Sequence, residues 1–338
     1  MSKITDLTAL AVLPAAGDLV PFVDVSDTTD SANGTTTKVS YQTFGGLFLA
    51  SNVRYVSGSF SGFVAPFYST VTAAIAAASS GDLIYVLPGT YSAAVTLVDG
   101  VNIHLCAGAT LSGGVITPAG ACSVVISGEG VISSSAGRAF EVDATTTSGT
   151  IIVFAKQILA TAGAAVWVEA SSVITLRLFV TSITTTSANS VSRYAVAMAS
   201  SGSTVFIYNS QISTDGTSAS VETVTQTAGT MELINCTITR TGGNMTAVTC
   251  SNPTAMRIRN SRIVNTNDGT ASDGIELVTG GLVLSNVEIV VTNATAVSID
   301  ATGAADVVVY GNAVSNRDKD ANVTVRVGTL TVDSTYVT

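Results

Sequence analysis

The sequence has few charged residues and no basic patch. Charged residues make up 11% of its 338 residues, and 14 basic against 23 acidic residues give a net charge of -9 at neutral pH. The basic residues are spread from Lys3 to Arg326. Because nucleic-acid binding depends on concentrated positive charge, we expect no nucleic-acid partner.

Histidine is nearly absent, and cysteine lacks the spacing of a metal site. His104 is the only histidine, so neither a histidine-based triad nor a zinc centre is expected, and we predict no metal and no cofactor. The cysteines lie in alternating apolar stretches without C-x-x-C spacing, which favours buried free thiols over disulfides or metal ligands. They are Cys106, Cys122, Cys236 and Cys250.

Long apolar runs are missing as well. No segment is long enough to span a bilayer, and the opening "MSKITDLTAL" has no basic segment followed by an apolar one. We therefore expect no membrane insertion and synthesis in the cytoplasm of the producing cell.

What the sequence does contain is a repeat. Five segments of the second half are centred on Asn209, Asn235, Asn260, Asn286 and Gly311, at intervals of 26, 25, 26 and 25 residues. Each alternates apolar and polar residues before its centre and resumes soon after it, which predicts strand, tight turn, strand. Asn and Gly both tolerate a left-handed backbone, and stacked asparagines can hydrogen-bond along the axis.

Second β-rich stretches lie between these segments, for example "SVETVTQT" and "DGIELVTG". About three short strands for each repeat of ~25 residues, with no helical pattern between them, are typical of a solenoid. The sequence therefore predicts an all-β fold, a right-handed parallel β-helix of about ten rungs from Leu83 onward, by division of this span by the ~25-residue repeat.

A short helix is predicted just before the first rung, in "YSTVTAAIAAASSGDLIYVLPGTY". Ser69 or Thr70 would cap it and it would end near Gly81, closing the open end of the core. Its apolar face would comprise Val71, Ala74, Ile75 and Ala78.

The segment "AAIAAASSGDLIYVLPGTYSAAVTLVDGVNIHLCAGATLSG" resembles the beginning of pectin-lyase-like right-handed β-helix proteins. The resemblance covers residues 69–338, the capping helix and the β-helix. It implies the fold, but the family includes lyases, glycoside hydrolases, esterases and non-enzymatic virion fibres. The fold alone does not choose among these functions.

Residues 1–50 lack the repeat. Alternation in "DLVPFVDVSD", the turn-rich "SANGTT" and then "TKVSYQTF" indicate a small β-unit. This segment resembles the N-terminal adaptor of many bacteriophage tail-fibre and spike proteins, which implies attachment to other virion proteins. Residues 51–68 would form a connector to the solenoid.

Catalytic candidates are few. Asp268, Asp273 and Glu276 in "NTNDGTASDGIEL" are carboxylates of the kind a polysaccharide-cleaving site requires. The "DGI" resembles the aspartate motif of polygalacturonase-like hydrolases, but the Gly-His-Gly and Arg-x-Lys segments of that family are missing. Asp-Gly pairs also suit turns, so loop chemistry is the alternative interpretation.

The segment "MRIRNSRIVN" holds three outward-facing arginines. The repeat aligns Arg257 with Glu232 on the rung before and Arg262 with Glu288 on the rung after, which predicts ion pairs between adjacent strands. Arg259 has no such neighbour, so it is a candidate for binding a ligand.

Aromatic residues add two further candidates for glycan binding, Tyr208 and Tyr310. A contact between subunits is the alternative. Outward apolar positions favour a parallel homotrimer, because a monomeric solenoid would expose them. These positions are Phe206, Ile234, Val283 and Val308.

The sequence therefore suggests a structural surface protein of a bacteriophage virion, a fibre, spike or decoration made in the bacterial host cytoplasm, whose solenoid can contact host surface polysaccharide. A tailspike depolymerase is the main alternative, and a self-standing pectinase-like enzyme is a third.

Overall fold

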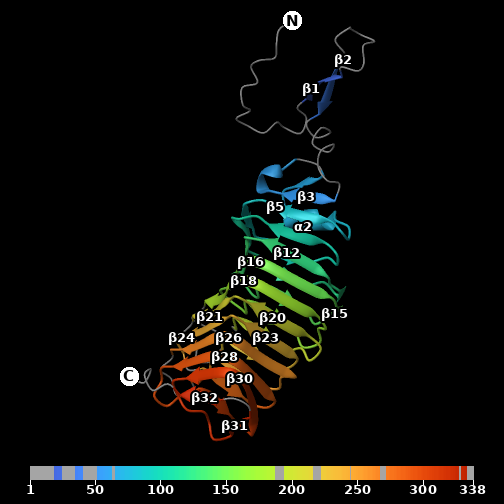
Figure 1. Ribbon diagram of the computed structural model, residues 1–338. Coiled ribbons are helices and arrows are strands. Elements are labelled where there is room, and N and C mark those ends of the chain that lie inside the picture. Colours follow the sequence, from blue (N-terminus) through green and yellow to red (C-terminus); the bar gives the residue numbers. More distant parts are fainter. Residues whose placement is uncertain are drawn as a thin grey trace.

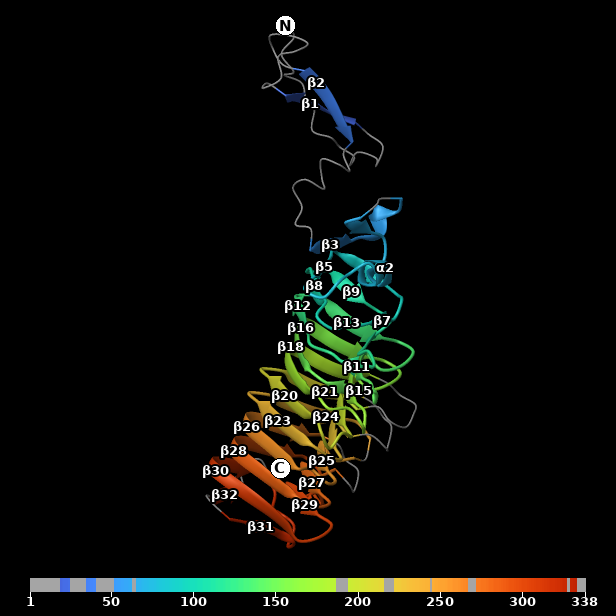
Figure 2. The ribbon, with the colours of Figure 1, turned by 90° about the vertical axis from the view of Figure 1, so that its right-hand side faces the viewer.

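The computed structural model describes residues 19–24, 35–40, 52–62, 65–186, 194–215, 222–243, 245–266, 272–326 and 329–332. It is a right-handed parallel β-helix of about nine turns, close to the ten expected (Figures 1 and 2). Strands account for 55% of the chain and helix for 4%. The predicted fold is thus confirmed.

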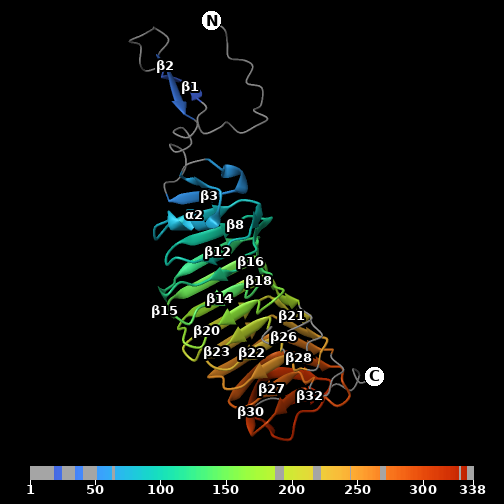
Figure 3. The same ribbon diagram turned by 180° about the vertical axis from the view of Figure 1, so that it is seen from behind.

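One side of the solenoid is a 9-stranded parallel sheet of very short strands, partly visible from behind in Figure 3. Its strands are β7 (Val95–Thr96), β10 (Val115–Ile116), β14 (Phe140–Val142), β17 (Val166–Val168), β19 (Val196–Met198), β22 (Val224–Gln226), β25 (Val248–Cys250), β27 (Ile275–Leu277) and β29 (Ile299–Ala301). A small two-stranded sheet, β11 (Gly120–Ala121) with β15 (Thr146–Ser148), lies beside it in the early turns.

The remaining strands of the solenoid form one large sheet that bends sharply along its length. Before the bend lie β3 (Val53–Val56), β4 (Phe67–Tyr68), β5 (Leu83–Val86), β8 (Asn102–Leu105), β12 (Val124–Gly128), β20 (Thr204–Tyr208), β23 (Thr230–Ile234) and β31 (Val323–Val325). After it lie β6 (Gly89–Tyr91), β9 (Ala109–Leu111), β13 (Val131–Ser134), β21 (Gln211–Asp215), β24 (Thr237–Thr241) and β32 (Thr329–Val332). Five long strands run through it: β16 (Thr150–Ala160), β18 (Thr175–Thr186), β26 (Ala255–Asn265), β28 (Gly281–Val291) and β30 (Ala305–Ser315).

The core is built from side chains that repeat in register from rung to rung. One inward column is 0 to 1% exposed along its whole length, so each member is removed from water by its neighbours above and below. Full burial of such a side chain contributes about 1.5 to 3 kcal/mol. The column comprises Ile84, Ile103, Ile126, Val153, Leu178, Ile207, Leu233, Ile258, Leu284 and Val309.

The bend falls at the predicted repeat centres. Asn209, Asn235, Asn260 and Asn286 have φ of 54°, 54°, 49° and 53°, and Gly311 has φ of 72°. The expected left-handed backbone is therefore confirmed. At Asn209 and Asn235 two strands flank a two-residue break, as predicted, whereas in β26, β28 and β30 one strand continues through the bend.

The predicted helix is present as α2 (Val71–Ala76). The Thr70 hydroxyl accepts a hydrogen bond from the amide of Ala73 at 3.2 Å, and Val71, Ala74 and Ile75 are buried. The helix ends at Ala76, earlier than the expected end near Gly81, and the Asp82 carboxylate accepts a hydrogen bond from the Ser79 amide at 2.6 Å in the turn that follows.

The sheet begins at Val53, upstream of the expected Leu83. β3 pairs in parallel with both β4 and β5, so part of the predicted connector belongs to the solenoid. The 3-10 turn η1 (Gly58–Phe60) links β3 to β4.

Within residues 1–50, the structure describes two strands. β1 (Leu19–Asp24) and β2 (Thr35–Ser40) pair as an antiparallel hairpin that is separate from the solenoid sheets. This agrees with the two β stretches predicted on either side of "SANGTT". Attachment through this segment remains a prediction.

The cysteines are free, as predicted, with Cys106 half-buried and the other three buried. In the described ranges, no helix is both long and apolar enough to cross a membrane.

Candidate binding surface

One outward position repeats in register along the solenoid, immediately before the bend. We call this set the outer column. It brings the three glycan-binding candidates Tyr208, Arg259 and Tyr310 onto one line. Its members are Tyr55, Tyr85, His104, Ser127, Phe154, Phe179, Tyr208, Ile234, Arg259, Ser285 and Tyr310.

The rings of the outer column stack on one another. The centroid of Phe179 lies 4.7 Å from that of Phe154 and 4.6 Å from that of Tyr208, with interplanar angles of 11° and 6°. Tyr85 and His104 stack in the same way at 4.8 Å. Aromatic pairs contribute about 0.5 to 1.5 kcal/mol beyond burial. The ring faces are thus used within the chain.

Arg259 has an ion partner, contrary to expectation. Its Nε lies 2.9 Å from Oε1 of Glu232, the carboxylate that the repeat assigned to Arg257. Arg257 is the direct ladder neighbour of Glu232, but Arg259 lies beside the apolar Ile234 and its long side chain reaches diagonally to Glu232. Among the described residues, Arg257 makes no ion pair. The sequence alignment therefore identified the correct two strands but assigned Glu232 to the wrong arginine.

The pair of Arg262 and Glu288 is confirmed, with 2.7 Å between Nε and Oε2. Both side chains are partly exposed, so the pair contributes only about 0 to 1 kcal/mol. Its charges remain accessible to a ligand at the surface.

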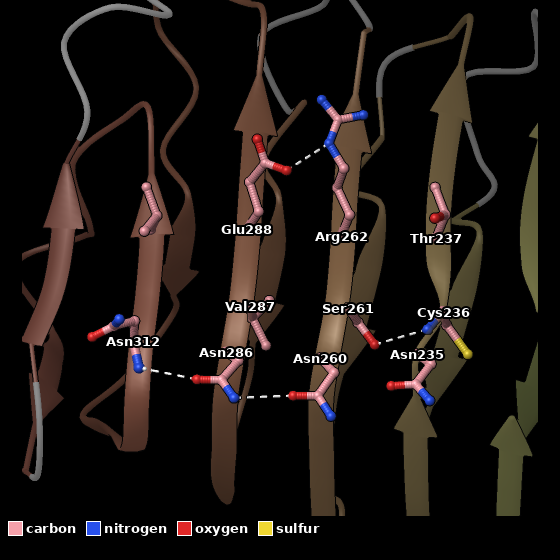
Figure 4. A pocket seen from close by; sticks show the side chains of 11 residues that line it. Asn235, Cys236, Thr237, Asn260, Ser261, Arg262, Asn286, Val287, Glu288 and Asn312 are labelled. Carbon is pink, nitrogen blue, oxygen red and sulfur yellow. Dashed lines mark hydrogen bonds and ion pairs between the residues drawn. The ribbon is translucent and has the colours of Figure 1, made fainter. Parts of the chain in front are cut away.

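An open groove of about 760 Å³ follows the bend, directly beside the outer column. We call it the asparagine groove. Figure 4 shows asparagines on adjacent strands and, above them, the ion pair of Arg262 with Glu288. The groove is lined by Asn235, Cys236, Thr237, Asn260, Ser261, Arg262, Asn286, Val287, Glu288, Asn312 and Val314.

The asparagines form a partial hydrogen-bonded ladder, as predicted. Nδ2 of Asn286 donates to Oδ1 of Asn260 at 3.0 Å, and Nδ2 of Asn235 donates to Oδ1 of Asn209 at 3.1 Å. The backbone amide of Asn312 donates to Oδ1 of Asn286 at 3.4 Å. An amide has two donor hydrogens and two acceptor lone pairs, so each keeps hydrogen-bonding capacity for a ligand.

Tyr310 is the most open aromatic residue of the outer column. It is 56% exposed, and the column residue before it is the small Ser285. Tyr310 therefore differs from Tyr208, whose neighbours Phe179 and Ile234 lie on either side of it.

The catalytic candidates do not line the asparagine groove. Asp268 lies outside the described residues. Asp273 precedes β27 and its Oδ1 accepts a hydrogen bond from the amide of Val297 at 2.7 Å, a loop-stabilising role. Glu276 faces outward on β27, with Thr249 and Asp300 as ladder neighbours. Glu276 therefore belongs to the nine-stranded sheet, and Asp273 lies in the segment just before it.

Both carboxyl groups have raised pKa values. Burial, and to a smaller extent the charge of Asp300, raises the pKa of Asp273, and the same two causes raise the pKa of Glu276. A raised carboxyl pKa is what a general acid needs. No group of three metal-ligating side chains occurs in the described part of the chain.

Two arginines have structural roles that the sequence did not reveal. Arg138 lies 4.2 Å above the ring of Trp167 and forms ion pairs with Glu141 and Glu169, so this tryptophan is covered rather than open to sugars. Arg240 points into the core from β24, and its burial lowers its pKa. Because the alternation of the repeat places Arg240 at an inward position, the sequence did contain a signal for its burial.

Comparison with protein-family models, curated proteins and solved structures found no match to the chain. The β-helix is therefore established by the geometry alone, and the choice of function depends on the surface.

Proposed function

We propose that this chain is a structural surface protein of a bacteriophage virion, a fibre, spike or decoration that attaches through residues 1–50 and contacts host surface glycan along its solenoid. The observation that carries the proposal is the asparagine groove. It combines regularly spaced amides with an exposed ion pair on a shaft of repeated rungs.

The chemistry of the groove suits a hydroxyl-rich polymer. Amides, hydroxyls and a guanidinium can donate to and accept from sugar hydroxyls. Rungs repeat at ~4.8 Å, which is close to the length of one sugar residue in an extended chain. A polysaccharide lying along the axis meets equivalent amides in successive rungs, with Arg259 and Tyr310 beside it.

The attachment role is supported by the sequence of residues 1–50, which resembles phage adaptor segments and contains the hairpin of β1 and β2. Expression without residues 1–50 tests it. The shortened chain should keep the circular dichroism of a β-helix and fail to assemble onto particles.

Glycan binding is tested with purified capsule and lipopolysaccharide of the host. Asn260→Gly with Asn286→Gly removes two groove amides while keeping a residue that tolerates positive φ. Each hydrogen bond contributes about 0.5 to 1.5 kcal/mol, so affinity should fall about tenfold or more. Asn209→Gly is the matched control, because Asn209 has the same backbone conformation outside the groove. Equal binding by all three proteins contradicts the proposal.

A second candidate function is a depolymerase that cleaves bacterial surface polysaccharide. The raised pKa values of Asp273 and Glu276 favour it. The test is a gain of reducing or unsaturated ends when polymer is incubated with the protein. Cleavage that is abolished by Asp273→Asn or Glu276→Gln would replace the structural role with an enzymatic one.

A further inference from the structure

The stack of rings in the outer column is interrupted at Ser285. On other rungs the stack is continuous: Phe154 and Phe179 are neighbours with ring centroids 4.7 Å apart, so each ring takes up the space of one rung. Ser285 has the same register position, between Arg259 and Tyr310. Its side chain is too short to fill the space that a ring takes up elsewhere in the column. We call this space the Ser285 gap.

The exposed aromatic residues of the column lie next to its serines. Tyr310, beside Ser285, is 56% exposed, and Phe154, beside Ser127, is 42% exposed. Within the described ranges, no other aromatic side chain is as open as these two. Each serine therefore uncovers a ring on the next rung.

The two serines differ in their surroundings. The Ser127 hydroxyl is hydrogen-bonded to Nδ1 of His104 at 3.0 Å, so its polar group is used within the chain. The Ser285 hydroxyl makes no hydrogen bond to any residue of the described ranges. Ser285 is also followed directly by Asn286, which lines the asparagine groove on the strand between those of Asn260 and Asn312 (Figure 4). The Ser285 gap is thus open to a ligand that lies in this groove.

Arg259 does not close the gap from the neighbouring rung. Its side chain reaches diagonally to Glu232 on β23, and β23 pairs with the edge of β26 that faces away from β28. The guanidinium is therefore directed away from Ser285. A ring placed over Ser285 would meet Tyr310 on one side and the aliphatic stem of Arg259 on the other, and such stems pack well on apolar surface.

We propose that the Ser285 gap binds one sugar ring, and that this ring is a side branch of the glycan that lies in the asparagine groove. The inference rests on the proposed function, because it takes the main chain of the glycan to follow the groove along the axis. The gap opens sideways from the groove, on the face before the bend. A ring held there is joined to the main chain as a branch, so the ligand class is a branched glycan.

The gap suits a sugar ring in size. A ring on the Ser285 rung lies one rung spacing, ~4.8 Å, from Tyr310. This spacing matches the 4.7 Å between the stacked rings of Phe154 and Phe179.

The chemistry of the gap also suits a sugar. Tyr310 offers an apolar ring for the C–H face of the sugar and a hydroxyl for its edge. The Ser285 hydroxyl and the Asn286 amide donate to and accept from sugar hydroxyls. A purely aromatic ligand would leave these polar groups without partners, which is unfavourable. A sugar is therefore the better occupant.

Filling the gap is the first test. Ser285→Phe places a ring on this rung, where it stacks on Tyr310 as Phe154 stacks on Phe179. Its affinity for purified host capsule or lipopolysaccharide should fall about tenfold or more relative to the wild type. Its melting temperature should stay the same or rise, because the added ring extends the stack. Ser285→Ala leaves the gap open and should keep most of the affinity.

Thr239→Phe is the matched control for added bulk. Thr239 is also a half-buried outward residue, but it lies on β24 after the bend and does not line the groove. Thr239→Phe should leave the affinity unchanged, whereas Tyr310→Ala, which removes one side of the gap, should lower it. A folded Ser285→Phe variant with the affinity of the wild type overturns the inference.

The branch itself is tested with the polymer that the wild type binds. After its side-branch sugars are removed enzymatically, this polymer should bind the wild type about tenfold more weakly. The wild type and Ser285→Phe should then bind it equally. Equal affinity of the wild type for the intact and the debranched polymer contradicts the inference, and so does a bound polymer that has no branches.

These outcomes separate the inference from the proposed function. A wild-type protein that binds glycan equally well with the gap open or filled contradicts the former and leaves the latter standing. A wild-type protein that binds no glycan contradicts the proposed function, and the inference is lost with it.

Discussion

Arg259 forms its ion pair with Glu232 at 2.9 Å, although Glu232 lies directly beside Arg257 in the strand ladder. The diagonal pairing leaves Arg257 without an ion pair among the described residues. It also directs the Arg259 side chain toward the register of Arg257, two residues farther from the bend.

Replacement of Glu232 tests this relationship. Only 12% of the Glu232 side chain is exposed, against 34% for Glu288. Glu232→Gln should lower the free energy of unfolding by about 1 kcal/mol and Glu288→Gln by less, because exposed pairs contribute little. Urea denaturation measures both. An equal or larger loss for Glu288→Gln contradicts the structure.

The bend makes Asn260 sensitive to the shape of its replacement. At φ of 49°, a β-branched side chain collides with the backbone. Asn260→Val should therefore lower the free energy of unfolding by about 1 to 2 kcal/mol or more. The loss is measured as a lower melting temperature. Asn260→Gly should cost less than Asn260→Val, and the reverse order would mean that the bend does not need this conformation.

Inward and outward positions of adjacent strands should respond differently to truncation. Ile258 is fully buried in the core column. Ile258→Ala should cost about 2 to 5 kcal/mol in urea denaturation. Val283→Ala, at an outward position on the next rung, should cost much less in a single copy. Comparable losses at the two positions would place Ile258 outside the core.

Glu276 should destabilise the fold as it ionises. Its pKa is raised in the folded state, so the stability associated with its neutral form is present at low pH and is lost as pH rises through that raised value. Glu276→Gln should match the wild type near pH 4 and be relatively more stable at pH 7. Asp306, whose pKa is lowered by Arg326, should show the opposite sign: Asp306→Asn loses stability at pH 7 and recovers it at low pH. Melting temperatures across this range give both results.

Thiol labelling should distinguish one cysteine from three. Burial raises the pKa of Cys122 and of Cys250 to about 12 each, and raises that of Cys236 as well. At pH 8 the native protein should expose one reactive thiol, Cys106, and the unfolded protein all four. Mass spectrometry of the labelled peptides identifies them, and fast labelling of Cys250 would show that the core is open.

The fold was predictable because the repeat is strict in the second half. Once Asn209, Asn235, Asn260 and Asn286 are aligned, the alternation of the strands gives the inward and outward positions. The aligned rungs also show which arginines lie next to glutamates on the rung before or after. The diagonal choice between Arg257 and Arg259 was not predictable. It depends on side-chain length and on which neighbour is apolar, and neither property is periodic.

Only part of the outer column could be predicted from the sequence. Tyr208, Arg259 and Tyr310 fall in the regular part of the repeat, whereas Phe154 and Phe179 lie where the spacing changes from turn to turn. Loops of different length precede those strands, so the spacing in the sequence does not show which residues lie side by side on successive rungs. The start of the sheet at Val53 was missed for a related reason, because the helix and its loops separate β3 from β5.

The constant register also makes the solenoid modular. Residues 236–260 form one complete turn that begins and ends at the same point of the bend, since Asn235 and Asn260 share their backbone conformation. Excision of this span joins Asn235 to Ser261 in the geometry that Asn260 already has, and shortens the shaft by one rung of ~4.8 Å. The length of this protein is therefore a quantity that gene duplication or deletion can change in fixed steps without redesigning the core.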